Sequence, residues 1–173
     1  MGDVMRGVIA LILAGLQFSC TPQPDSEPAF ICAPEQFKDG AVLVLTTNYE
    51  TSSLDLFHPN CPDEIRQNLV IASGDAVLRK WANRPIVVNR GSESNLMVLD
   101  ENLDVVAQIG LEDCGPHDII DLNEDTLLVS CYESTNIQKV TLSEERVEVW
   151  LDLEDYAGSD GFPEMDALAI DEN

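Results

Sequence analysis

The apolar residues after position 40 fall into short runs separated by polar clusters, a pattern typical of strands joined by turns. Three segments share one design, in which an apolar strand, a polar turn and a second strand follow one another: AVLVLTTNYETSSLDLF, RPIVVNRGSESNLMVLD and TLLVSCYESTNIQKVTL. Only residues 62–69 show the spacing of a helical face. The pattern therefore predicts an all-β domain over residues 41–173.

The three hairpins recur at a nearly constant interval. Equivalent aliphatic positions are 42 and 41 residues apart: Leu54, Leu96 and Ile137. An aspartate before a short apolar strand forms a second landmark: Asp75, Asp118 and Asp166. Periods of about 40–45 residues with four strands per unit are typical of β-propeller blades. A β-sandwich with a coincidental period is the alternative.

The segments 86–90 with 95–100, and 129–133 with 136–142, resemble the blades of bacterial propellers of the YVTN and NHL kind, particularly those of envelope lipoproteins. The resemblance implies a partial propeller of about three four-stranded antiparallel blades in an open arc. Residues 165–173 resemble the start of a further repeat without its partner strand, so we expect a truncated product or a fragment of a longer protein. These motifs specify architecture and leave function open.

The first twenty residues have the layout of an export signal. Arg6 precedes the apolar run 8–16, which is too short to span a bilayer and has the length of a signal-peptide core. Ser19 and Cys20 follow, and then the proline-rich stretch TPQPDSEP. This order resembles the bacterial lipoprotein signal.

The lipoprotein resemblance implies a signal peptide at residues 1–19, lipid on Cys20, and a tether over residues 20–40. Thr21, rather than an aspartate, after the lipidated cysteine implies the outer membrane. Gln17 and Phe18 depart from the family, which prefers leucine and a small residue at these two places. An ordinary exported protein that keeps Cys20 as a thiol or disulfide partner is the alternative.

The cysteine count agrees with export. Apart from Cys20, four cysteines remain, an even number that suits a compartment where disulfides persist: Cys32, Cys61, Cys114 and Cys131. Two strand-like runs, 116–121 and 126–130, lie between Cys114 and Cys131, so a hairpin would bring these two together and leave Cys32 for Cys61. Metal ligation is the rival, although the chain has no CxxC and no HExxH motif.

Charge narrows the choice of partners and ligands. Nine Lys and Arg residues stand against 32 Asp and Glu, so the net charge of −23 excludes a nucleic-acid partner. The acidic stretch 151–166 could hold calcium, but a solvated loop is the preferred interpretation. Related by propeller rotation, Asp75, Asp118 and Asp166 would form an arc that either binds a cation or accepts backbone hydrogen bonds where its strands begin.

No nucleophile elbow, P-loop, dinucleotide fingerprint or zincin helix occurs in the chain. His117, beside Asp118, could act as a base but has no recognisable nucleophile. Trp81 and Trp150 are expected in contacts between blades. The sequence favours a non-catalytic envelope protein that is held to the membrane by lipid and binds a protein or glycan partner. The alternative is a lactonase-like hydrolase with a metal in the central channel.

Overall fold

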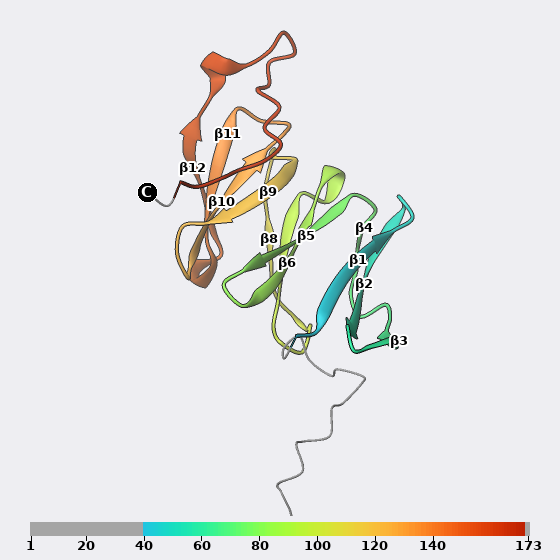
Figure 1. Ribbon diagram of the computed structural model, residues 1–173. Helices are drawn as coiled ribbons and strands as arrows, with labels where there is room; N and C mark the ends of the chain where they lie inside the picture. The colour runs from blue at the N-terminus through green and yellow to red at the C-terminus, as the bar shows by residue number, and fades with distance from the viewer. Residues whose placement is uncertain (1–39, 172–173) are drawn as a thin grey trace, which may run out of the picture. The chain divides into compact units, whose positions relative to one another are not determined.

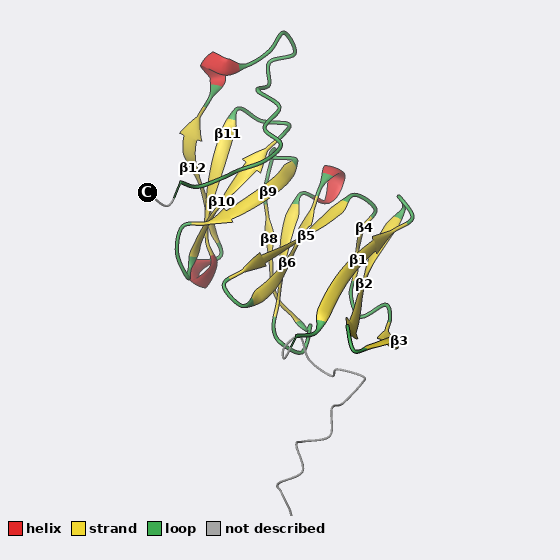
Figure 2. Cartoon of the chain, viewed as in Figure 1, coloured by secondary structure: helices red, strands yellow, loops and turns green. Residues whose placement is uncertain are grey.

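The computed structural model describes residues 40–171, all of which belong to the compact unit Ile31–Asn173. These residues form twelve strands in three four-stranded antiparallel sheets, and the only helical elements among them are three 3₁₀ turns (Figures 1 and 2). The signal peptide, Cys20, most of the tether and Cys32 lie outside the described residues.

Sheet A contains the first four strands: β1 Val42–Thr47, β2 Thr51–His58, β3 Cys61–Arg66 and β4 Ile71–Ser73. Its order is β1-β2-β3, and β4 also pairs with β2. A helix over residues 62–69 is wrong, because this stretch is bound to β2. The Leu69 N–H donates to Leu54 O at 2.9 Å, and the Leu54 N–H donates to Val70 O at 3.0 Å.

Sheets B and C each run through four consecutive strands in order. Sheet B contains β5 Ala76–Trp81, β6 Arg84–Asn89, β7 Asn95–Leu99 and β8 Val105–Gly110. Sheet C contains β9 Pro116–Asp121, β10 Thr126–Cys131, β11 Asn136–Thr141 and β12 Arg146–Asp152. The three predicted hairpins are confirmed as β1-β2, β6-β7 and β10-β11, each in its own sheet.

The sheets lie side by side, with sheet B between the other two (Figure 1). Strand alternation explains this order, because Val87 packs in the cluster shared with sheet A, whereas Ile86 and Val88 pack in the cluster shared with sheet C. All three side chains are fully buried. A sheet covered on both faces needs continuous apolar runs, which is what β6 and β7 supply. The all-β partial propeller with an open arc is therefore confirmed.

The two tryptophans differ in their surroundings. Trp81 is 5% exposed in the cluster between sheets B and C, and its Nε1–H donates to Asn123 O at 3.1 Å. Trp150 is 49% exposed on the edge strand β12. The prediction of a contact between blades is confirmed for Trp81 and wrong for Trp150, which no described sheet covers.

Candidate functional site

The three landmark aspartates do not occupy equivalent positions. Asp75 precedes β5, whereas Asp118 is the third residue of β9, and Asp166 lies after β12 in a stretch without assigned strand. Asp75 pairs with the Arg90 guanidinium at 3.1 Å. Each carboxylate has its own partner, and within residues 40–171 no three His, Cys, Asp or Glu side chains are placed to hold a metal ion. Among the described residues, Asp75, Asp118 and Asp166 therefore do not form a cluster of metal ligands.

Asp118 joins three successive segments at the inner edge of the arc. Its Oδ1 accepts a hydrogen bond from Arg79 Nε of β5 at 2.5 Å, and its Oδ2 accepts one from the Leu168 N–H at 3.2 Å. Burial alone would raise the pKa of Asp118, but the Arg79 guanidinium and the Leu168 amide together hold that pKa below its usual value. Asp118 thus acts as a charged link between blades. The backbone hydrogen bond that it accepts from Leu168 comes from a segment 50 residues away and not from the start of its own strand.

His117 also binds the stretch that follows β12. Its Nδ1 lies 2.9 Å from Asp166 Oδ1, and its ring stacks on Tyr132 with centroids 4.5 Å apart. A hydrogen bond with the Glu164 carboxylate and its negative charge raise the pKa of the Tyr132 phenol. These contacts hold the stretch in place. They bring no described nucleophile to the imidazole, so the base hypothesis stays untested.

The acidic stretch 151–166 begins at the end of β12 and continues as a loop. The 3₁₀ turn Glu154–Tyr156 opens it, and the Gly158 N–H donates to Phe162 O at 2.9 Å to close the next turn. Asp160 Oδ1 accepts the Phe162 N–H. Asp152 and Asp160 are exposed and bonded within the loop, whereas Glu164 and Asp166 at its end contact Tyr132 and His117.

The predicted Cys114–Cys131 disulfide is confirmed, with Cα atoms 4.5 Å apart. Strands β9 and β10 form the expected hairpin between the two cysteines. Cys61 is disulfide-bonded as well, but its predicted partner, Cys32, lies outside the described residues. Both bonded cysteines of sheet C are fully buried, so this disulfide is part of the core.

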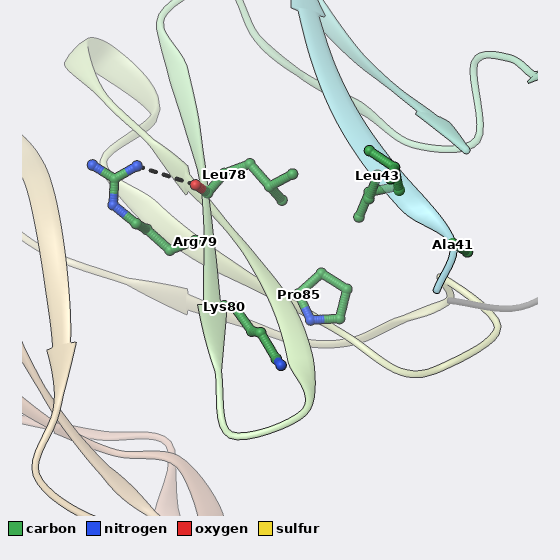
Figure 3. Close-up of a pocket in the computed structure, with 7 residues that line it drawn as sticks. Ala41, Leu43, Leu78, Arg79, Lys80 and Pro85 are labelled. Atoms are coloured by element: carbon green, nitrogen blue, oxygen red, sulfur yellow. Dashed lines mark hydrogen bonds between the residues drawn. The ribbon is translucent and has the colours of Figure 1, made fainter. Parts of the chain in front are cut away.

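A partly apolar groove lies between β1 of sheet A and β5 of sheet B. Its volume is about 420 Å³, and seven residues line it: Ala41, Val42, Leu43, Leu78, Arg79, Lys80 and Pro85. Leu43 of β1 and Leu78 of β5 point toward one another across the groove, with Pro85 between them and Lys80 at the rim (Figure 3). The Arg79 guanidinium turns away and donates to Leu78 O at 3.1 Å. We call this feature the β1 groove.

The β1 groove runs beside the edge of β1. In sheets B and C the equivalent strand has a further strand paired to this edge. Strand β5 pairs with β6 and β9 pairs with β10, so in sheets B and C a further strand precedes the hairpin. Among residues 40–171, β1 pairs with β2 alone. Within the part of the chain that the structure describes, β1 is therefore an edge strand of sheet A.

The backbone groups of β1 that face this edge follow from the pairing register. Leu54 directs its N–H and its carbonyl oxygen to residues 70 and 69, on the far side of β2. Leu45 lies directly opposite Leu54, so the pair is not hydrogen-bonded and the Leu45 N–H and C=O point away from β2. Leu43, two residues along, points the same way. The edge offers donors and acceptors in a row beside an apolar groove.

The sequence analysis missed the β1 groove, although the repeat carried a signal for it. The hairpins starting at Arg84 and Thr126 are each preceded by a strand-like run within a few residues, whereas the apolar run nearest to the hairpin starting at Ala41 is AFICA at residues 29–33. No helix in residues 40–171 is long and apolar enough to cross a membrane. No model of a known protein family matches the chain, and no curated protein matches it either.

Proposed function

We propose that this protein is a lipid-anchored envelope protein whose propeller-like arc is a non-catalytic binding or scaffold module, and that the β1 groove is its binding site. The apolar run 8–16, Ser19 and Cys20 support the anchor. The single observation that carries the binding role is the open edge of β1 beside an apolar groove. An edge of this kind binds an extended segment by strand addition.

The chemistry of the groove selects the ligand class. Main-chain groups of Leu43 and Leu45 would pair with any extended backbone, while the Leu43, Leu78 and Pro85 side chains accept apolar side chains. Lys80 is exposed at the rim and forms no salt bridge with any described residue. The preferred ligand is therefore an extended peptide that alternates apolar and acidic side chains.

The test is fluorescence anisotropy with the full chain and a labelled nine-residue peptide of alternating leucine and aspartate. We expect saturable binding, and Lys80→Glu should weaken it about 3- to 10-fold, because an attraction at the rim becomes a repulsion. Arg146→Glu makes the same charge change on β12, away from the groove, and should leave binding unchanged.

Two further peptides isolate the strand-addition mechanism. A version with N-methyl groups on alternate residues cannot donate to the edge and should not bind. A version with lysine in place of aspartate should bind more weakly than the original. Equal affinity for all three peptides would contradict a groove that recognises both the backbone and the charge of its ligand. An equal loss of affinity in Lys80→Glu and Arg146→Glu would contradict it as well.

A further inference from the structure

We infer that the pocket between sheets B and C is a second binding site, and that its ligand is a small organic cation with an ammonium group on an apolar body. The volume of this pocket is about 390 Å³, within the range of about 300–1,000 Å³ that small-molecule sites have. We call it the B–C pocket. None of the residues that line it lines the β1 groove, so it is separate from the peptide site proposed above.

The floor of the B–C pocket is apolar and belongs to the core between the two sheets. Four residues of this core line it, three from sheet B and one directly after β11: Trp81, Val98, Ala107 and Leu142. Trp81 is 5% exposed, and its indole N–H is already bound to Asn123 O. The ring therefore offers a ligand apolar contact rather than a hydrogen bond, and the floor suits the hydrocarbon part of the ligand.

Hydrogen bonds between turns hold the walls of the B–C pocket in place. The Trp81 indole fixes the β9-β10 turn to sheet B. The same turn is fixed to the turn after β11, because the Asp125 carboxylate accepts the Ser143 N–H at 2.8 Å and the Ser143 hydroxyl at 2.7 Å. The Leu142 N–H also donates to Asp125 O at 2.9 Å. A ligand therefore meets a preformed cavity, which lowers the entropy cost of binding.

Negative charge exceeds positive charge around the B–C pocket. Glu124, Asp125 and Glu145 line it together with a single guanidinium, that of Arg84. Three carboxylates and one guanidinium leave two negative charges in excess. Glu124 and Glu145 are exposed, and neither forms a salt bridge within residues 40–171. These two carboxylates are therefore available to attract an ammonium group at the mouth of the pocket.

Arg84 marks the place where a cation fits in the B–C pocket. Its guanidinium lies over the Trp81 ring, with Cζ 5.9 Å from the ring centroid. The face of an aromatic ring is the negative part of its quadrupole and attracts a cation. Arg84 is exposed and forms no salt bridge with any residue that the structure describes, so its long side chain can turn to solvent. A ligand ammonium group then takes its place over the ring.

The surroundings of the B–C pocket disfavour other classes of ligand. A metal ion needs several ligating atoms close together, and within the described residues no three His, Cys, Asp or Glu side chains are placed to provide them. An anion would meet three carboxylates, and a neutral ligand would gain nothing from the charges. The net charge of −23 adds to the preference for a cation, because the field of an acidic chain concentrates cations at its surface.

Tryptophan fluorescence of the full chain measures binding, because one of its two tryptophans lines the B–C pocket. Trp150→Phe removes the signal of the other. The probe is cyclohexylmethylammonium, and cyclohexylmethanol and cyclohexanecarboxylate carry a neutral and a negative group on the same ring. We expect the ammonium compound to bind several-fold more tightly than the alcohol, and the carboxylate to bind most weakly. Equal affinity for all three, a preference for the carboxylate, or no saturable change in fluorescence would overturn the inference.

Substitutions of the charged residues separate a built site from the general field of the chain. Glu124→Gln combined with Glu145→Gln should weaken binding of the ammonium probe about 3- to 10-fold. Arg84→Gln should strengthen it about 3-fold, because a repelling charge is removed and the Trp81 ring is uncovered. Glu93→Gln is the control and should leave the affinity unchanged, since exposed Glu93 follows β6 at the end away from Arg84. An equal loss in the control and the double variant, or weaker binding in Arg84→Gln, would overturn the site.

Discussion

Breaking the Cys114–Cys131 disulfide should remove about 3 kcal/mol of folding free energy. The bond closes a loop with a sequence separation of 17 residues, and the chain-entropy relation gives about 3 kcal/mol at 25 °C for a loop of this size. We expect the β9-β10 hairpin inside the loop to keep its ladder when the bond is absent, so the loss should reflect the greater freedom of the unfolded chain. Urea unfolding followed by circular dichroism measures this difference.

The cleanest comparison uses one sequence in two redox states. Serine in place of Cys20, Cys32 and Cys61 leaves a single disulfide, and oxidised and reduced samples then differ only in that bond. This design avoids the cavity that replacing a buried cysteine would create. Loss of less than about 1 kcal/mol would show that the unfolded loop is already constrained and would refute the entropic reasoning.

Three further predictions concern a charge, a glycine and the anchor. Asp118→Asn should cost about 2 kcal/mol near neutral pH, since it weakens the hydrogen bonds that a largely buried carboxylate accepts from the partly exposed Arg79 and from the Leu168 amide. Because the folded-state pKa of Asp118 is lowered, this difference is present above about pH 4 and disappears as the pH falls through the folded pKa. The matched change at exposed Asp75, Asp75→Asn, should show little effect in urea unfolding at the same pH values. Gly74→Ala should cost about 1–3 kcal/mol, because its Cβ would lie 2.5 Å from a backbone oxygen, whereas Gly110→Ala meets nothing within 4 Å and should be neutral or slightly stabilising in thermal melts. Mass spectrometry of the mature amino terminus should find lipid on Cys20, and an unmodified cysteine there would contradict the anchor.

The hairpins and their grouping into separate sheets were predictable because the evidence for them is local. Strand alternation and the 41- to 42-residue period follow from residues within one blade. The Arg79–Asp118 link was not predictable, because its partners are 39 residues apart and nothing in either local pattern selects the other. Trp150 was misplaced for a related reason. The apolar residues of its strand suggested burial, but whether another sheet packs on that strand depends on long-range contacts that the local sequence does not encode.

The aspartate landmark failed through a shift in register. Val88 lies opposite Leu96 and Val77, while Ser130 lies opposite Ile137 and Asp118. Leu96 and Ile137 are equivalent, so Asp118 takes the place of Val77, two residues after Asp75. A shift of two residues keeps a side chain on the same face of the sheet and therefore leaves the apolar alternation intact. The sequence period could not reveal it.

Two kinds of contact join neighbouring blades, and they have different consequences for assembly. The apolar clusters between sheets supply most of the stabilisation but are not directional, so they would accept many faces of similar shape. The inner-edge contacts, from Arg79 to Asp118 and from Asp118 to the Leu168 amide, are directional and set which strand follows which. At sheet A the apolar side is exposed in the β1 groove, and at the other end the inner-edge segment already stands in order. The directional contacts therefore determine the order of the strands along the arc, while the apolar clusters determine how firmly the sheets hold together.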